Sequence, residues 1–132
     1  MSMIRNDDYF KQGILFDNLL HGKRHPTDID AMVELNDKAY YFVELKRKGN
    51  NIRTGQKILF ERLCNALEET GKKAYAILAH HTEKTQDKNG DIYLRHCYID
   101  EIYYADRKKW IAPKKDTSVG DFDDWFYHEY DK

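Results

Sequence analysis

Apolar and polar residues alternate along the chain between Thr27 and Lys46. This period of two, in a segment rich in β-branched and aromatic residues, predicts a β-hairpin whose strands are joined by a polar turn at 36–38. The first strand has one apolar face, formed by Ile29, Ala31, Val33 and Leu35. The second strand has an apolar face formed by Tyr41, Val43 and Leu45. Its other face carries Glu44 and Lys46, two charges in a strand that is otherwise apolar.

The three-residue turn determines which residues of the hairpin face each other. It pairs Leu35 with Ala39, and the same register places Asp30 opposite Glu44. Directly opposed side chains have Cβ atoms roughly 5 Å apart, so two carboxylates in these positions repel each other unless a cation lies between them. Mg²⁺ commonly binds one or two protein carboxylates and completes its shell with water and phosphate oxygens. The hairpin therefore predicts a divalent-cation site at the end away from its turn.

The alternative interpretation of these charges is structural. In the same register Asp28 lies opposite Lys46, so the charged residues would form a ladder of ion pairs on the protein surface. Exposed ion pairs usually contribute less than about 1 kcal/mol to stability. A ladder of this kind would have no chemical role.

Hydrophobic periodicity predicts the elements on either side of the hairpin. Apolar residues recur at helical spacing over Asp7–Leu20 and over Thr54–Gly71, where the threonine is a suitable N-cap and the glycine a suitable end. The nearly continuous apolar run at 74–81 predicts a central strand, buried on both faces and parallel to one strand of the hairpin. Two further strands are predicted at 92–99 and 101–105.

The segment 117–132 is acidic and rich in aromatic residues. Its aromatic residues recur at helical spacing, at Phe122, Trp125, Phe126 and Tyr130. This tail is expected to form a short helix that docks on the domain or on a second copy of the chain, which would be a homodimer. The order helix, hairpin, helix, strand and further strands predicts an α/β fold with a mixed central sheet flanked by helices, in a single domain over 1–132.

Composition limits the partners and the compartment. The chain has 132 residues and a net charge of −1, so any contact with nucleic acid must come from a local basic patch. Cys64 and Cys97 lie far apart without the spacing of a metal site, which is typical of reduced thiols in the cytoplasm. The sequence contains no apolar run of transmembrane length, and its first ten residues are too charged for a signal peptide. A cytoplasmic protein with no membrane partner is expected.

A basic patch follows the hairpin. The segment 46–57 has five basic residues, two glycines and no acid. We expect Lys48, Arg53 and Lys57 to bind phosphates, together with Arg24 from the loop that precedes the hairpin. The alternative is that both loops are simply solvated.

Two other features leave alternatives open. His80 and His81 lack the spacing of a zinc finger, so the remaining interpretations are a loop histidine near substrate or an ordinary loop. Trp110 lies beside three basic residues and is expected either to stack on a base or to cover the edge of the sheet.

The order of an aspartate on one strand and Glu-x-Lys at the end of the next resembles the PD-(D/E)xK nuclease superfamily. The matching residues are Asp30, Glu44 and Lys46. The runs Pro26-Thr27-Asp28-Ile29 and Gly55-Gln56, and the segment 99–110, also resemble small phage and prophage members. The resemblance covers roughly residues 10–110 and implies a restriction-endonuclease-like core, α-β-β-α-β with extra strands. It also implies a bacterial cell, or one infected by a phage.

The resemblance implies a role for each site residue. Mg²⁺ or Mn²⁺ would be held by Asp30, Glu44 and the carbonyl of Leu45. Lys46 would orient the attacking water or stabilise charge on the phosphate, and Gln56 would help to position the nucleophile. Two further acids, Asp17 and Asp28, are candidates for an accessory role.

Three functions follow from these features. The first is a metal-dependent nuclease that hydrolyses phosphodiester bonds, with DNA preferred over RNA as the partner. The second is a catalytically inactive nuclease-fold module of phage origin that binds nucleic acid or protein. The third is an interaction module in which the acidic aromatic tail is the binding surface.

Overall fold

The computed structural model describes residue 15 and residues 19–22, 29–50 and 54–132. Its strands are β1 (Ala31–Leu35), β2 (Ala39–Arg47), β3 (Lys73–His81), β4 (Tyr98–Tyr104) and β5 (Lys109–Ile111). Its helices are α2 (Thr54–Glu69) and α3 (Val119–Tyr130), and short 3₁₀ turns occur at Leu19–Gly22, Glu83–Thr85 and Leu94–His96.

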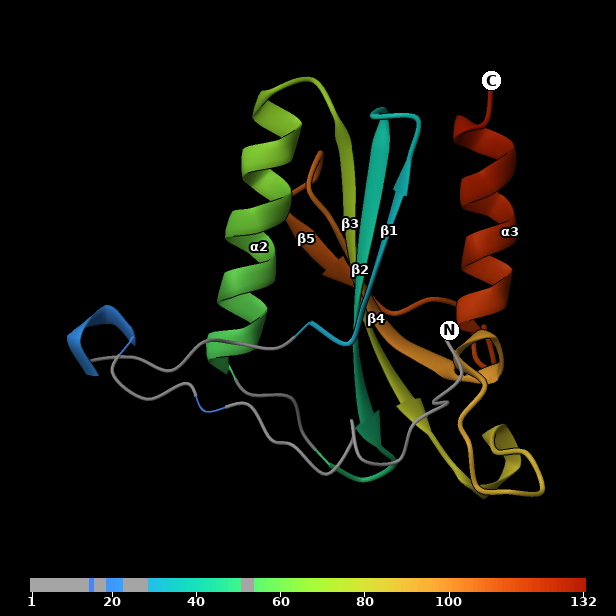
Figure 1. Ribbon diagram of the computed structural model, residues 1–132. Coiled ribbons are helices and arrows are strands. Elements are labelled where there is room, and N and C mark those ends of the chain that lie inside the picture. The colour runs from blue at the N-terminus through green and yellow to red at the C-terminus, as the bar shows by residue number, and fades with distance from the viewer. Residues whose placement is uncertain (1–14, 16–18, 23–28, 51–53) are drawn as a thin grey trace.

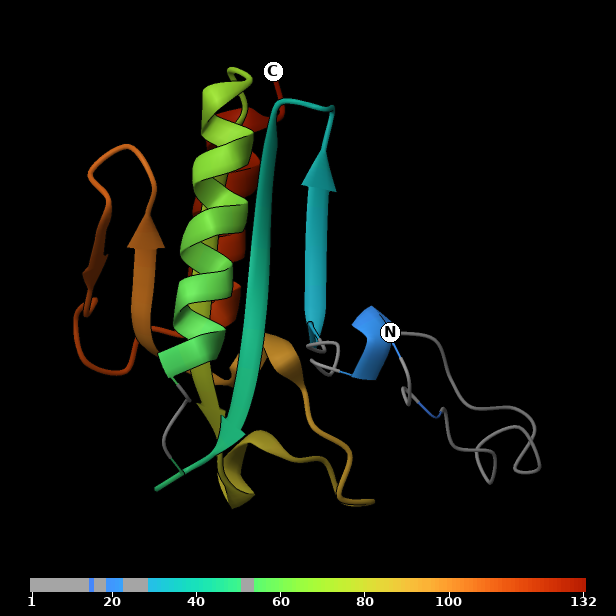
Figure 2. The ribbon, with the colours of Figure 1, turned by 90° about the vertical axis from the view of Figure 1, so that its left-hand side faces the viewer.

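The five strands form one open sheet in the order β1-β2-β3-β4-β5. Strands β2 and β3 are parallel, whereas every other neighbouring pair is antiparallel. Helix α2 covers one face and α3 covers the other, so the protein has three layers with a core on each side of the sheet (Figure 1). Figure 2 shows α2 in front of the sheet, with β1 and β5 at the two edges of the sheet. The predicted α/β class with a mixed central sheet is confirmed.

The hairpin has the predicted register. Leu35 is the partner of Ala39, and the turn at 36–38 is closed by the Lys38 N–H, which donates to the Leu35 carbonyl at 3.0 Å. Asn36 and Asp37 have left-handed φ values of 53° and 55°, a conformation that these two residue types tolerate better than most. Pairing extends from this turn to Ala31 opposite Val43.

Helix α2 connects the parallel strands β2 and β3 as predicted. It ends in a Schellman motif, in which the Lys72 N–H donates to the Leu67 carbonyl at 3.1 Å and the Gly71 N–H donates to the Glu68 carbonyl at 3.0 Å. Gly71 has a φ of 87°, which explains the choice of glycine at this position. The chain therefore reverses at the C-terminus of α2, and the N-terminal end of α2 is the end nearer to the carboxyl ends of β2 and β3 (Figure 1).

The prediction of two strands at 92–99 and 101–105 is wrong. Residues 94–96 form a 3₁₀ turn, and β4 then runs unbroken over Tyr98–Tyr104. The register shifts between Leu78, which pairs with Glu101, and Ala79, which pairs with Ile99. Asp100 is thus the extra residue of a β-bulge. In the sequence pattern alone, such a residue resembles a break between two strands.

The acidic aromatic segment 117–132 contains α3, which docks on the sheet of its own chain. Ser118 and Asp121 form a capping box at its N-terminus. Phe122 and Phe126 pack edge-on against the Tyr41 ring, with ring centroids 5.2 and 4.9 Å away. Phe126 is only 1% exposed, so this helix supplies much of one core.

The helix predicted over Asp7–Leu20 lies mostly outside the described residues. Leu15, which is described, is exposed and not helical. The 3₁₀ turn Leu19–Gly22 has left-handed φ values at Leu20 and His21, which an α-helix does not accept in succession. The prediction is wrong at these positions. Within the described ranges, no helix is both long and apolar enough to cross a membrane.

Candidate functional site

Three of the predicted site residues meet at Glu44. The Lys46 ammonium lies 2.9 Å from Glu44 Oε1, and the Gln56 side-chain amide donates to the same oxygen at 3.0 Å. Glu44 and Lys46 share one face of β2 because they are two residues apart in a strand. Gln56 reaches them from the first turn of α2, which packs on that face.

The second carboxylate oxygen of Glu44 is buried and unsatisfied. Glu44 is 4% exposed, and its Oε2 has no hydrogen-bond partner among the described residues. The side-chain oxygen of Gln56 is also buried without a hydrogen-bond partner among the described residues. A buried acceptor without a partner costs about 1–3 kcal/mol, and more when it is charged. Because carboxylate and amide oxygens are the ligands that hard divalent cations prefer, these groups fit such an ion.

Asp30 lies one residue beyond the paired part of β1. Its carboxylate accepts a hydrogen bond of 2.7 Å from the Leu45 N–H, and that nitrogen is bonded to the carbonyl carbon of Glu44. The Asp30 carboxylate therefore lies against the backbone at 44–45, while the Glu44 carboxylate contacts Lys46 and Gln56. In a strand the N–H and C=O of one residue point toward the same neighbour, so the Leu45 carbonyl faces this edge too.

The described residues do not by themselves complete a metal site. Across residue 15 and the ranges 19–22, 29–50 and 54–132, no group of three or more His, Cys, Asp or Glu side chains gathers at metal-binding distance. Mg²⁺ typically takes only one or two carboxylates and obtains its other ligands from water and substrate. The accessory candidates Asp17 and Asp28 lie outside the described residues.

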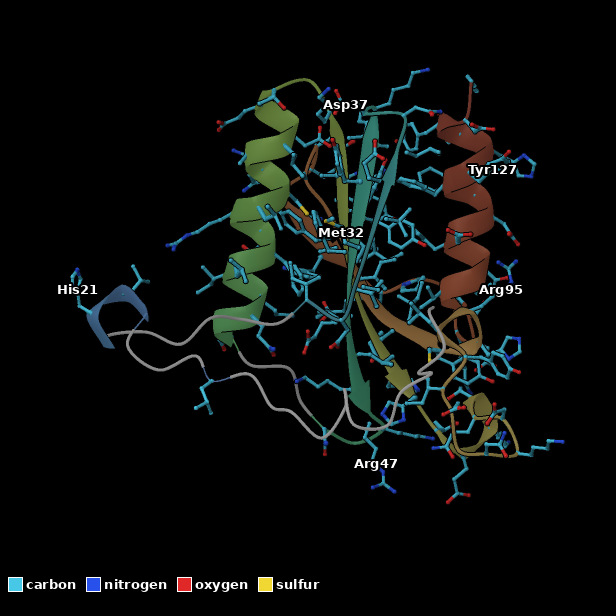
Figure 3. All side chains as sticks on the ribbon, viewed as in Figure 1. His21, Met32, Asp37, Arg47, Arg95 and Tyr127 are labelled. Atoms are coloured by element: carbon cyan, nitrogen blue, oxygen red, sulfur yellow. The ribbon has the colours of Figure 1, made fainter. Side chains whose placement is uncertain are left out.

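A cleft of about 630 Å³ opens beside this group. It is lined by Lys46, Lys48, Gly49, Asn50, Lys57, Leu78, His80, Asp100 and Glu101. These residues come from β2 and the segment that follows it, from β3, from α2 and from β4 at its bulge. Figure 3 shows Arg47 at this end of β2, opposite to Asp37 in the hairpin turn. In open α/β sheets, ligands bind outside the carboxyl ends of the strands.

The predicted phosphate-binding residues have different surroundings. Lys48 lines the cleft. Lys57 also lines it, but its ammonium is 2.9 Å from the Glu101 carboxylate and 5.1 Å from the centre of the Trp110 ring. Its charge is thus largely compensated within the protein. Arg24 and Arg53 lie outside the described residues.

Trp110 covers the edge of the sheet, which was one of its two predicted roles. It lies in β5, and its indole N–H donates to the Glu61 carboxylate at 3.1 Å. Its ring packs against that of Tyr103, with centroids 5.2 Å apart. These contacts hold the ring against the α2 layer rather than presenting it to a base.

One pair at this site was missed by the sequence analysis. His80 lies in β3, within the run 74–81 that predicts a strand, but its contact with Asp100 was not predicted: its Nδ1 is 2.9 Å from the Asp100 carboxylate. His80 is the register partner of Lys46 on β2, and both line the cleft. The available signal was its place at the end of an apolar strand, which is where α/β proteins build ligand sites.

No family model, curated protein or solved structure matches this chain. The resemblance to PD-(D/E)xK nucleases therefore depends on the motif Asp30, Glu44 and Lys46. The structure adds the surroundings of this motif: Glu44 contacts Lys46 and Gln56 through one carboxylate oxygen, and its other oxygen is buried without a partner among the described residues.

Proposed function

We propose that this protein is a metal-dependent nuclease that hydrolyses phosphodiester bonds, with DNA as the expected substrate. The observation that carries the proposal is the state of Glu44. One of its oxygens is held by Lys46 and Gln56, while the other is buried without a partner among the described residues. A divalent cation would satisfy that oxygen. The adjacent cleft is lined by Lys48, and by Lys46 and Lys57, which are paired with Glu44 and Glu101, and it offers a place for a phosphate chain.

The arrangement of elements supports the same proposal. Strands β1 and β2, helix α2 and strand β3 follow one another as in the β-β-α-β part of a restriction-endonuclease-like core. Strands β4 and β5 and helix α3 would be additions to that core. We infer this fold type together with the function, since both depend on the same motif.

The residues of the chain would divide the chemistry among them. Mg²⁺ or Mn²⁺, held by Asp30, Glu44 and the Leu45 carbonyl, would supply Lewis-acid polarisation of the phosphate and activation of a water molecule. Lys46 balances the charge of Glu44 and would donate to a phosphate oxygen as negative charge builds on it. Gln56 fixes the orientation of the Glu44 carboxylate through Oε1, and in doing so it directs Oε2.

Cleavage assays test the proposal directly. Duplex, branched and single-stranded DNA and RNA would be incubated with Mn²⁺, with Mg²⁺ and with EDTA. We expect metal-dependent cutting that falls by at least about 10²-fold in Asp30→Ala, Glu44→Gln and Lys46→Ala. Glu69→Gln, an exposed acid at the other end of α2, is the matched control and should cut like the wild type. A wild-type protein that is folded but cuts none of these substrates with either metal would refute the assignment.

The second candidate is a nuclease-fold module that binds without cutting. It is favoured by the contacts that already engage the site, because Lys46 neutralises Glu44 and the Leu45 N–H binds the carboxylate of Asp30. A module of this kind would bind nucleic acid or protein in EDTA and would cut nothing in Mn²⁺. The same assays, run beside a binding measurement, separate the two.

A further inference from the structure

We propose that His80, oriented by Asp100, is a second phosphate-contacting side chain of this site, and that its Nε2 donates to a phosphodiester oxygen. The proposal rests on the proposed function for the class of ligand, nucleic acid. It adds a residue that the PD-(D/E)xK motif does not contain. His80 would be the residue that touches substrate, and Asp100 the residue that positions it.

The β-bulge in β4 brings the pair together. In a regular ladder, Asp100 and its neighbour Glu101 would lie on opposite faces of the sheet. The register shift between Leu78 and Ala79 leaves Asp100 without a partner on β3. Bulges re-aim side chains in this way, and here the Asp100 carboxylate reaches Nδ1 of His80 at 2.9 Å. Asp100 and Glu101 therefore both line the cleft, although they are neighbours in the strand.

The ring of His80 is held from two sides. Asp100 binds its Nδ1, and Tyr98, its register partner on β4, packs against its ring with centroids 5.8 Å apart. A protonated imidazole donates from both nitrogens. With Nδ1–H donating to Asp100, Nε2–H of the protonated ring is the donor that the described residues leave for a ligand. The side chain is 21% exposed, so it is anchored but accessible.

His80 also lies where a nucleic-acid strand would pass. On β3 it is the partner of Lys46, and alternation places both on the face covered by α2. Beyond it is a second hollow of about 540 Å³, which shares Lys48, His80 and Asp100 with the first. The rest of that hollow is lined by Thr82, Glu83, Lys84, Tyr98, Ile99, Lys115 and Asp116.

The shared residues explain why an extended ligand fits better than a small one. A ligand that occupies both hollows must cross His80. It meets Lys46, paired with Glu44, on one side, and on the other it meets Lys84 and Lys115, with Glu83 and Asp116 in the same lining. Phosphates spaced along a polynucleotide would match cations spaced along this path. The competing explanation is that His80 and Asp100 form an ion pair that only closes the strand end.

Binding and NMR on the full chain in EDTA distinguish these explanations without requiring turnover. Affinity for a fluorescently labelled DNA duplex would be measured by anisotropy. The imidazole nitrogens would be followed in protein labelled with ¹⁵N-histidine as the unlabelled duplex is added. His81, the next residue along β3, points to the opposite face by alternation, so His81→Ala is the matched control.

We expect the duplex to shift Nε2 of His80 and not the ring nitrogens of His81. His80→Ala should weaken binding about tenfold, the effect of losing one hydrogen bond to a charged group, whereas His81→Ala should not change it. An unshifted Nε2 at saturation, equal affinity of His80→Ala and the wild type, or a wild type that does not bind the duplex would each overturn the proposal.

Variants of Asp100 separate positioning from charge. Removing an acid should strengthen the binding of a polyanion if charge alone matters, and Asp100→Asn and Asp100→Ala remove the same charge. Asparagine keeps an oxygen that accepts from Nδ1–H, but alanine does not. We therefore expect Asp100→Ala to bind more weakly than Asp100→Asn, with loss of the Nδ1–H signature in the spectrum. Equal or tighter binding by Asp100→Ala would show that Asp100 does not position the ring.

The outcomes also distinguish this proposal from the nuclease proposal. If the wild type cuts nothing with Mn²⁺ but the His80 contact is observed, the chain is a binding module and the contact stands. If the wild type cuts, and His80→Ala binds and cuts DNA equally well, the nuclease proposal is supported and the His80 contact is refuted.

Discussion

Replacing Lys46 with methionine should destabilise the metal-free protein and make it more responsive to a divalent cation. The Lys46 ammonium lies 2.9 Å from Glu44 Oε1, and Glu44 is only 4% exposed. When one partner of a buried ion pair is removed, the other keeps its charge but has neither water nor a counter-ion. Methionine retains a long, flexible side chain, so loss of packing contributes little.

The size of the effect follows from the burial of the two side chains. Breaking a fully buried ion pair costs about 3–5 kcal/mol. Because the Lys46 side chain is 30% exposed, water replaces part of the lost interaction, and we expect a loss of about 2 kcal/mol. For a domain of this size that corresponds to a decrease in Tm of roughly 8 °C. Mn²⁺ at ten times its dissociation constant should restore about 1.4 kcal/mol.

Thermal unfolding followed by circular dichroism, in EDTA and in Mn²⁺, provides the measurement. The wild type, Lys46→Met, Glu44→Gln and the double variant form a double-mutant cycle. In the Glu44→Gln background there is no carboxylate that could be left without a counter-ion. Lys46→Met should therefore lower the free energy of unfolding by less than about 0.5 kcal/mol in that background. Additive effects, or a Lys46→Met protein as stable as the wild type in EDTA, would refute the reasoning that Glu44 depends on this cation.

Two further predictions concern the fold. A Cβ at Gly120, in the first turn of α3, would lie 2.5 Å from Arg95 Cγ and 2.9 Å from the Arg95 carbonyl oxygen. Gly120→Ala should therefore lose about 1–2 kcal/mol in urea unfolding, whereas Gly55→Ala, which has no heavy atom within 4 Å of its Cβ, should gain up to about 1 kcal/mol. Burial raises the pKa of the Cys64 thiol from 9.0 to about 12. As the pH rises, the unfolded chain therefore loses this proton before the folded protein does. The free energy of unfolding, constant in this respect below pH 9, should fall by up to about 1.4 kcal/mol per pH unit between pH 9 and 12. Cys64→Ala should make this dependence on pH less steep.

The register of the hairpin was predictable because two independent signals agree. The period of two assigns each residue to a face, and the three polar residues at the turn set which residues pair. Only one pairing satisfies both, and it is the one observed, from Leu35 opposite Ala39 to Ala31 opposite Val43. Continued by one residue, that register brings Asp30 level with Glu44, and the Asp30 carboxylate is found on the neighbouring Leu45 N–H.

The other side of the cleft was not predictable in the same way. A bulge adds one residue to a strand, and in a sequence an added polar residue is indistinguishable from a turn. The pattern therefore predicts a boundary between two strands at Asp100, and it does not predict that Asp100 contacts His80. Strand β5 was missed because its three residues are too few to show a period. These elements depend on long-range pairing with β3 and β4, which no local pattern encodes.

The strongest argument for function at Glu44 comes from comparing it with Thr85, the other buried polar side chain in the described part of the chain. The Thr85 hydroxyl donates to the Thr82 carbonyl at 2.8 Å and accepts from the Thr82 N–H at 3.0 Å. It is satisfied by its own turn, as a structural polar group is expected to be. Glu44 is charged, more expensive to bury, and left with one oxygen unsatisfied by the described residues. An apolar residue at that position would pack against α2 without this penalty, so the fold by itself provides no reason for a carboxylate. A ligand that binds there would provide one.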